Sequence, residues 1–295
     1  ISINVETGNQ EKEPFEIDFR YSNKCNLKCR MCNPASSNLI AKEVLENKEL
    51  QNFDENGKSK TIDVYSSSVI YKWIRNVKTL KKLRLLGGEP SIDENTINLL
   101  DDIDTEVDIQ FTSNLVSFNK KFKNALAKRK NVRIRGSIDA VGFNYEYIRS
   151  NAKWSKVLKT IDYINNSENI IFSGINTVLQ PYNIFGLPDL FEFVRELKKK
   201  NNEFEFLIFP SAAESTNVKA IIEEDRVKIL NILKSNYNDF ILEISTIETI
   251  FELYPFSEDS LNTFRSYCIL LDKIRKTSIL EVDKRYSKYI NSKEI

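Results

Sequence analysis

The chain has 295 residues, with 43 basic and 42 acidic side chains and a net charge of +1. This length fits one large domain or a domain with a small extension, and the balanced charge gives no strong signal for nucleic-acid binding. The chain contains no histidine, which excludes Ser-His-Asp and Cys-His catalysis and every histidine-ligated zinc, haem or non-haem iron site.

Strand and helix patterns alternate through the first two thirds of the chain. Apolar alternation and short apolar runs predict strands at 15–20, 83–86, 107–112, 132–138, 170–179 and 204–209. Apolar residues at helical spacing predict helices at 36–50, 69–77, 95–103, 118–128, 154–164 and 185–199, with a polar loop at 51–61. This alternation is typical of a parallel α/β fold, and it leaves a doubly wound sheet and a partial barrel both open.

The chain changes character near residues 211–220. Helical patterns at 225–233 and 261–274 surround a predicted strand at 240–244. We therefore expect a core domain at 1–210 and a small α+β extension at 211–295.

The sequence also indicates a compartment. It has no apolar run long enough for a transmembrane helix, and residues 1–6 lack the basic and apolar segments of a signal peptide. Four cysteines are too few for a disulfide scaffold, and three of them fall within eight residues. Clustered free thiols fit a reducing environment, so we expect a cytoplasmic protein.

Those three cysteines follow the first predicted strand with the spacing C-x3-C-x2-C, at Cys25, Cys29 and Cys32. Soft thiolates select zinc, copper(I) or iron–sulfur clusters, and a structural zinc or an ordinary [4Fe–4S] cluster takes four protein ligands. Three ligands on one loop favour a cluster with one open iron. Unliganded thiols, and a zinc site completed by Cys268 or a carboxylate, are the alternatives.

This array resembles the defining motif of the radical S-adenosylmethionine (SAM) superfamily, and the resemblance extends across residues 15–210. It implies a partial (β/α)6 TIM-like barrel with a [4Fe–4S] cluster on the loop after the first strand. In that family the open iron binds SAM, and cluster reduction cleaves SAM to methionine and a 5′-deoxyadenosyl radical that abstracts a substrate hydrogen. Many members have an aromatic residue where this chain has Met31, a position that acts through its backbone and its packing near adenine.

The resemblance further implies a SAM site at the ends of the following strands. The segment Gly87, Gly88, Glu89 and Pro90 looks like the family's GGE motif, whose carbonyls and carboxylate hold the SAM amino group. The triplet Thr112, Ser113 and Asn114 would lie beside SAM at the end of the third strand. Helix capping and turn formation are the alternative explanations for such polar residues.

Three further groups complete this predicted SAM site. Ser137 and Asp139 offer acceptors for the ribose hydroxyls, and Arg149, in a Tyr-x-x-Arg element, would pair with the SAM carboxylate unless it is a solvated surface arginine. Adenine would be enclosed by Val178 or Leu179 together with Gln180 or Asn183, residues that strand and helix capping explains as well. The cations flanking the cysteines either ease reduction of the cluster or belong to a solvated loop; they are Arg20, Lys24, Lys28 and Arg30.

The C-terminal segment resembles a shortened Twitch- or SPASM-type extension. Such extensions bind auxiliary iron–sulfur clusters, but Cys268 is the one cysteine after residue 210 and cannot hold a cluster alone. Its neighbours at helical spacing include Phe264, Tyr267 and Leu271, which predicts a core position. The alternative is that Cys268 donates a hydrogen atom to a substrate radical.

Taken together, the resemblance implies a radical SAM enzyme of the oxidoreductase or transferase type, with one [4Fe–4S] cluster and SAM as cofactors. A flavodoxin- or ferredoxin-type electron donor is implied, and the substrate is a peptide or protein residue or a small metabolite. The alternative from another class is a non-catalytic iron–sulfur or zinc binding module.

Overall fold

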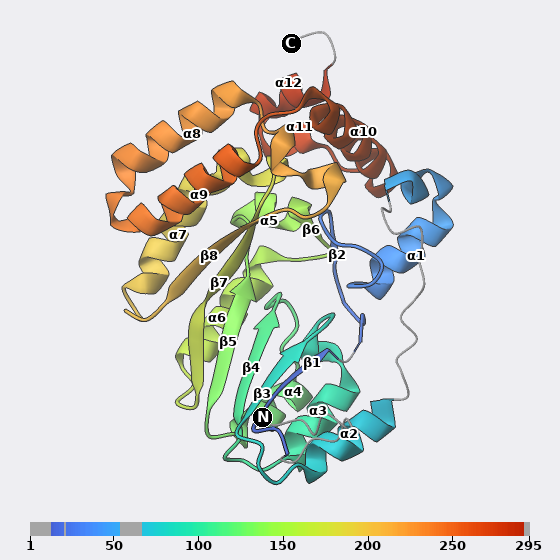
Figure 1. Cartoon of the computed structure of the whole chain (residues 1–295), viewed down its shortest axis with the longest axis vertical. Coiled ribbons are helices and arrows are strands. Elements are labelled where there is room, and N and C mark those ends of the chain that lie inside the picture. Colours follow the sequence, from blue (N-terminus) through green and yellow to red (C-terminus); the bar gives the residue numbers. More distant parts are fainter. Residues whose placement is uncertain (1–12, 21, 54–66, 292–295) are drawn as a thin grey trace, which may run out of the picture.

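Six strands form one parallel sheet in the order β1-β3-β4-β5-β7-β8 (Figure 1). The computed structural model of the chain describes residues 13–20, 22–53 and 67–291. The strands are β1 (Glu16–Arg20), β3 (Lys82–Leu86), β4 (Asp108–Ser113), β5 (Val132–Ser137), β7 (Ile170–Leu179) and β8 (Glu205–Pro210). All six predicted strands are therefore confirmed. Because the spatial order follows the chain order, every connection runs in one direction, which selects the partial barrel over a doubly wound sheet.

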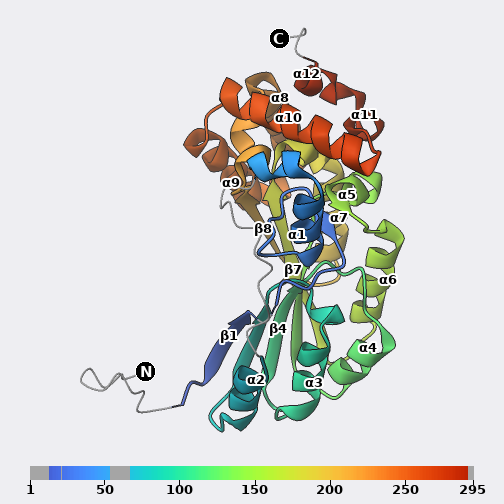
Figure 2. The same cartoon turned by 90° about the vertical axis from the view of Figure 1, so that its right-hand side faces the viewer.

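The helices between the strands cover one face of the sheet. They are α2 (Ser67–Asn76), α3 (Glu94–Asp102), α4 (Lys120–Ala127), α6 (Trp154–Asn165) and α7 (Leu187–Lys198), and Figure 2 shows α3, α4 and α6 on the same side of the strands. Side chains alternate along a strand, so one set, including Leu83, Leu85 and Ile109, is fully buried. The opposite set remains on the open face.

The cysteine segment leaves the sheet and forms a short ribbon. Its strand β2 (Lys28–Cys29) pairs antiparallel with β6 (Arg149–Ser150), which follows α5 (Gly142–Ile148). The predicted helix at 36–50 consists of α1 (Asn38–Glu46) and a 3₁₀ helix, η1 (Lys48–Phe53). The Ser37 side chain caps α1 by accepting the N–H of Ile40. Residues 54–61 of the predicted loop lie outside the described residues.

The C-terminal extension is helical over residues 211–291, and the predicted strand at 240–244 is wrong. Its helices are α8 (Glu223–Asn236), α9 (Ile241–Leu253), α10 (Glu258–Arg275), α11 (Ile279–Val282) and α12 (Ser287–Ile290). The β-branched residues around 241–250 favour a strand. However, Ile244, Ile247 and Ile250 recur at helical spacing and are buried, so packing decides for a helix. The extension lies over the carboxyl ends of the strands (Figure 1).

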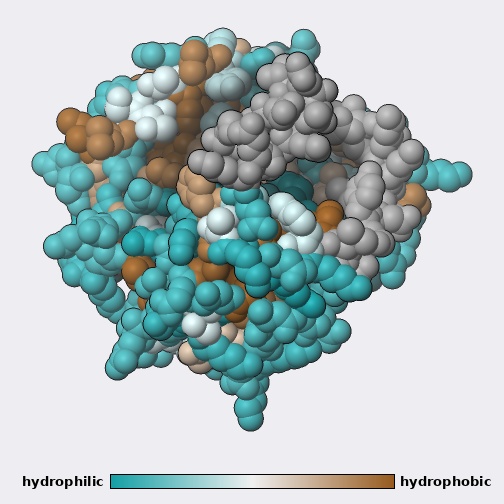
Figure 3. All heavy atoms as spheres, turned by 60° about the horizontal axis from the view of Figure 1, so that its bottom comes forward, coloured by the Kyte–Doolittle hydropathy of each residue, from teal (hydrophilic) through white to brown (hydrophobic). Residues whose placement is uncertain are grey.

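Short 3₁₀ helices connect the main elements. They are η2 (Pro90–Ile92), η3 (Pro181–Gly186), η4 (Glu214–Thr216), η5 (Val218–Ala220), η6 (Asn238–Phe240) and η7 (Lys284–Tyr286). Within the part of the chain that the structure describes, no helix is both long and apolar enough to cross a membrane. The lower end of the molecule is mostly hydrophilic, with apolar side chains in separate small patches (Figure 3).

Candidate active site

The carboxyl ends of β1, β3, β4 and β5 converge on a pocket of about 240 Å³, here called the cysteine pocket. Cys25, Cys29 and Cys32 line it together. The other lining residues are Arg20, Ser36, Leu86, Gly87, Gly88, Glu89, Thr112, Asn114, Ser137 and Arg149. The structure thus brings most of the predicted cluster and SAM residues to one place, as parallel strand ends require.

Glycine allows the loop after β3 to lie directly against the cysteine loop. The N–H of Gly88 donates to the Ser22 carbonyl at 2.8 Å, and the N–H of Glu89 donates to the Lys24 carbonyl at 2.8 Å. A Cβ on Gly88 would lie 2.1 Å from the Lys24 carbonyl oxygen, so no larger residue fits. Gly87 has φ of 130°, which only glycine adopts readily. The two glycines therefore fix the distance between the loops.

The three thiols form an electrostatically coupled set. Burial, together with neighbouring cysteines, raises the pKa of Cys25 and of Cys32 to about 12. Burial also raises the pKa of Cys29, whereas Arg149, with Nη1 at 3.7 Å from the Cys29 Sγ, lowers it. Because their thiolate forms would repel one another, these thiols need a bound cationic centre in order to lose their protons.

This donor set fits a cluster with three protein ligands. In a [4Fe–4S] cluster each cysteine binds a different iron, so the ligands need not meet at one ion. Among the described residues, no group of three or more histidine, cysteine, aspartate or glutamate side chains is arranged to hold a metal ion. The fourth cysteine, Cys268, lines neither the cysteine pocket nor the second pocket, of about 410 Å³, that shares Cys32 with it.

Glu89 joins the ends of β3 and β4 from within the cysteine pocket. Its Oε1 accepts hydrogen bonds from the Ser91 N–H (3.2 Å), the Ser91 hydroxyl (2.7 Å) and the Ser113 hydroxyl (2.8 Å). Its Oε2 accepts from the Asn114 N–H at 2.8 Å. Burial raises the pKa of Glu89, and these donors act against the shift. Ser113 therefore lies behind Glu89, and Pro90 is buried at the start of η2.

Asp139 supports Arg149 and does not reach the cysteine pocket. Its Oδ2 accepts from the Arg149 Nε at 2.8 Å, and its Oδ1 accepts from the Val178 N–H at 2.8 Å. Burial lowers the pKa of Arg149, but the negative charges of Asp139 and Cys29 raise it by more than burial lowers it. The guanidinium therefore stays charged. Of the two residues predicted for the ribose, Ser137 lines the cysteine pocket, whereas both oxygens of the Asp139 carboxylate accept hydrogen bonds from the protein.

Some of the residues predicted to enclose adenine are buried in the protein interior, and others line a pocket. Leu179, Gln180 and Asn183 are fully buried and do not line the cysteine pocket. Gln180 and Asn183 form a capping box at the start of η3, so capping, the alternative explanation, accounts for them. Val178 and Met31 instead line a neighbouring apolar pocket of about 410 Å³, which shares Cys32 with the cysteine pocket.

Arg30, between two of the cysteines, is bound to the C-terminal helix α10 and is not solvated. It is 1% exposed, and its Nη2 donates to Asp272 Oδ1 at 2.6 Å and to the Thr277 hydroxyl at 2.9 Å. Its guanidinium carbon lies 3.7 Å from the centroid of the Tyr147 ring. Asp272 offsets its charge, so neither explanation given for the flanking cations describes Arg30. The sequence carries no signal for a pair so far apart along the chain.

Cys268 occupies the predicted core position. Its thiol is fully buried, lies 3.6 Å from the Tyr147 hydroxyl, and has a pKa raised to about 11 by burial. The alternative role as hydrogen-atom donor needs contact with a ligand, and neither pocket beside Cys32 includes this thiol.

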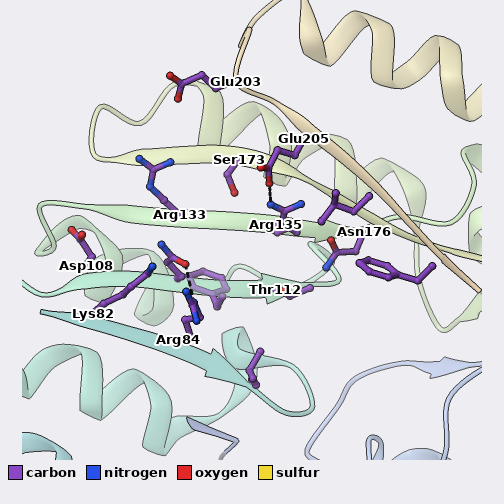
Figure 4. A pocket seen from close by; sticks show the side chains of 15 residues that line it. Lys82, Arg84, Asp108, Thr112, Arg133, Arg135, Ser173, Asn176, Glu203 and Glu205 are labelled. Carbon is purple, nitrogen blue, oxygen red and sulfur yellow. Dashed lines mark hydrogen bonds and ion pairs between the residues drawn. The ribbon is translucent and has the colours of Figure 1, made fainter. Parts of the chain in front are cut away.

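The open face of the sheet carries a larger hollow of about 890 Å³. Figure 4 shows Arg84 on β3, and Arg133 and Arg135 on β5, extending from this face of the sheet. Arg84 pairs with Glu16, and Arg135 pairs with Glu205. Thr112 lines both this hollow and the cysteine pocket, so the two are adjacent. The alternation of polar and apolar residues along β3, β4 and β5 is the signal in the sequence for this polar face.

A sequence model of the Radical SAM superfamily matches residues 19–194, more than half of the chain. The GTP 3′,8-cyclase of Staphylococcus epidermidis is 28% identical over 232 residues, which cover 75% of this chain and 62% of that protein. The probable GTP 3′,8-cyclase of Methanocaldococcus jannaschii is 24% identical over 238 residues, covering 77% and 71%. The chain therefore spans less than two thirds of the length of the Staphylococcus relative.

The fold is also similar to that of a solved structure, native anSMEcpe with bound AdoMet. The TM-score is 0.52 at 16% sequence identity, and the match covers 78% of this chain and 63% of the other. This likeness concerns the arrangement of strands and helices.

Proposed function

The chain belongs to the radical SAM superfamily, and from this premise we propose that Cys25, Cys29 and Cys32 hold its cluster. Family membership makes the protein an enzyme with a [4Fe–4S] cluster and SAM as cofactors. When bound, the cluster supplies an electron that cleaves SAM to the radical that removes a hydrogen atom from the substrate. The observation that carries the proposal is the convergence of the three thiols with four strand ends on one pocket.

The chain's own residues would bind SAM in the cysteine pocket. Carbonyls of Gly87 and Gly88 with the Glu89 carboxylate would accept hydrogen bonds from the ammonium group. Asp139 and Cys29 engage Nε and Nη1 of Arg149, which leaves Nη2 for the SAM carboxylate. Thr112, Asn114 and Ser137 line the same pocket, and the Ser137 hydroxyl has no hydrogen-bond partner in the described part of the chain.

The apolar pocket would take the adenine. Met31 and Val178 line it beside Cys32, and an aromatic base gains most where apolar side chains surround it. In this proposal the two ends of SAM would lie on either side of Cys32. It also gives Met31 the packing role that an aromatic residue has in other members.

The substrate would be a peptide residue or a small polar metabolite that reaches the site over the open face of the sheet. A triphosphate such as that of GTP needs several cations without carboxylate partners. On this face Lys82 and Arg84 both pair with Glu16, and Arg135 pairs with Glu205. Of the four cations that line this face, Arg133 alone has no ion-pair partner among the described residues. The balance of charge therefore favours a substrate with both donors and acceptors.

We further propose the organisation and surroundings of the enzyme. Residues 1–210 would form the catalytic domain, and 211–295 a Twitch-like extension without a cluster, because Cys268 is buried and alone there. An electron donor of the flavodoxin or ferredoxin type would supply the reducing electron in the cytoplasm. The core between residues 211 and 291 is built by helices that pack over the site.

The proposal is tested by anaerobic reconstitution with iron and sulfide, followed by dithionite and SAM. The wild-type protein and Cys268→Ala should turn brown, bind about four irons per chain and release 5′-deoxyadenosine. Cys29→Ala should lose the brown colour, the bound iron and the release of 5′-deoxyadenosine. If the wild type releases no more 5′-deoxyadenosine than Cys29→Ala, the enzymatic proposal is refuted. Bound zinc without the brown absorbance would favour the non-catalytic binding module.

A further inference from the structure

The β2–β6 ribbon is a wall with a different hollow on each side. Cys29 is paired with Arg149, and Lys28 with Ser150. Successive side chains of a strand point to opposite faces. Accordingly, Cys29 and Arg149 line the cysteine pocket, whereas Lys28 and Ser150 line an outer hollow of about 540 Å³. One layer of backbone therefore separates this outer hollow from a proposed ligand of the cluster.

The outer hollow combines an exposed aromatic ring with cations. Its walls come from β2, α5, the turn after β6 and the end of α10. These elements lie close together in Figure 1, and Figure 2 shows α5 next to α10. Phe143, at the start of α5, is 53% exposed, and Lys28, Lys153, Arg275 and Glu146 line the same hollow. Aromatic side chains and arginine are the residues that protein interfaces favour, and a polar rim commonly surrounds them.

The charges beside this hollow have a positive excess. Lys28 and Arg275 share one carboxylate, Glu43, at 2.7 and 2.6 Å, and Lys153 pairs with Glu146 at 2.9 Å. The last turn of α10 and its cap add Lys273 and Lys276, which are exposed and form no ion pair with other described residues. A surface of this kind attracts an acidic partner and steers its approach.

We infer that the outer hollow is the docking surface for a small acidic one-electron carrier of the flavodoxin or ferredoxin type. The inference rests on the proposed function, since it requires a cluster at Cys29. The reduced carrier loses one electron, and the cluster passes from the [4Fe–4S]²⁺ to the [4Fe–4S]⁺ state, so no other reactant is needed. Phe143 anchors the carrier and the lysines orient it, while the substrate keeps the opposite side of the ribbon.

The test compares two reductants on matched variants. Phe143→Ser removes the exposed ring, and Lys153→Gln removes a cation whose side chain is 67% exposed. Lys199→Gln is the control, because the Lys199 side chain is 63% exposed and also pairs with one glutamate, but this residue lies at the C-cap of α7, away from the hollow. For each protein, 5′-deoxyadenosine release is measured with dithionite and with reduced flavodoxin. Flavodoxin affinity and the rate of cluster bleaching after mixing are measured separately.

We expect Phe143→Ser to weaken flavodoxin binding about 10-fold, as loss of an interface aromatic does. Lys153→Gln should slow flavodoxin-driven cluster reduction about 2-fold at low salt and reduce its salt dependence. Dithionite-driven release should stay at the wild-type rate in all variants. Unchanged affinity and reduction rate in Phe143→Ser, or equal losses with both reductants, would overturn the docking surface. A wild-type protein that is inactive with dithionite would overturn the proposed function instead.

Discussion

Replacing Asp272 with asparagine removes the charge that offsets a buried guanidinium in the cysteine loop. The Arg30 side chain has no exposed area, and that of Asp272 is 14% exposed. Asp272 also accepts hydrogen bonds from the Tyr147 hydroxyl at 2.9 Å and from the Ile279 N–H at 2.9 Å. The variant retains an acceptor and nearly the same volume, so the change is mainly one of charge.

The expected cost follows from the burial of the pair. Removing one partner of a buried ion pair costs about 3–5 kcal/mol, because the other charge remains uncompensated. The partial exposure of Asp272 and the retained amide oxygen place Asp272→Asn near about 3 kcal/mol on that scale. This corresponds to an increase of roughly 100-fold in the unfolding equilibrium constant. Arg30→Met should recover part of the loss in the double variant, since no buried charge is then left alone.

Urea unfolding followed by circular dichroism measures the free energy, and Asp283→Asn is the matched control. Asp283 lies in the same extension and pairs with Arg285 at 2.6 Å, but their side chains are 25% and 58% exposed. The control should therefore cost less than about 1 kcal/mol. In cluster-free protein, thiol titration should also show faster reaction of Cys25 and Cys32 in Asp272→Asn only. Equal stability losses in the two variants would refute the view that α10 holds the cysteine loop through Arg30.

Three further predictions address other contacts of the site. Gly88→Ala should lower the unfolding free energy by about 2 kcal/mol or more and abolish iron incorporation, because its Cβ would lie 2.1 Å from the Lys24 oxygen. Gly142→Ala is the control: its φ of 58° also strains the backbone, but no atom lies within 4 Å of its Cβ, so this variant should retain iron. Cys268→Ala should be destabilised by about 1 kcal/mol and still release 5′-deoxyadenosine at the wild-type rate. If the variant folds and binds iron but releases no 5′-deoxyadenosine, the result would support the role of Cys268 as hydrogen-atom donor. Burial raises the pKa of Glu43, but hydrogen bonds from Arg275 and Lys28 outweigh burial, so the pKa in the folded protein is lowered. The ionised Glu43 therefore stabilises the fold fully above its unfolded-state pKa of about 4.3. This stabilisation is lost as the pH falls through the folded-state pKa. The stability difference between wild type and Glu43→Gln should therefore shrink below about pH 4, and a difference that does not change with pH would contradict this assignment.

Features that arise from local patterns could be predicted from the sequence. Each of the six strands carries its own alternation or apolar run, and chemistry at parallel strand ends must meet at one edge of the sheet. Gly87 and Gly88 were singled out by their resemblance to the family's GGE motif, and the structure adds the physical reason, because a Cβ on Gly88 would meet the Lys24 backbone. The strand predicted at 240–244 failed because its β-branched residues favour a strand while the burial of Ile244 and Ile247 requires a helix.

Contacts between distant segments could not be predicted. Arg30 and Asp272 lie on opposite ends of the chain, and nothing local marks them as partners. Gln180 and Asn183 have the polarity that a ligand site needs, but the same amides satisfy backbone groups at the start of η3. A sequence shows which residues can form hydrogen bonds, whereas the fold decides whether those bonds go to a ligand or to the protein itself.

Arg149 shows how the fold adds contacts to a residue that the sequence predicts to bind SAM. Pairing of β6 with β2 places this arginine opposite Cys29, so its guanidinium lies between a thiol and the Asp139 carboxylate. A lysine could not replace it, because a single ammonium group cannot hold three fixed directions at once. The same planar group can therefore orient on Asp139, offset negative charge at a cysteine and present one remaining edge to a carboxylate. Recognition of SAM and the electrostatics of the thiols would then depend on one side chain, which ties the binding of the cofactor to the state of the cysteine loop.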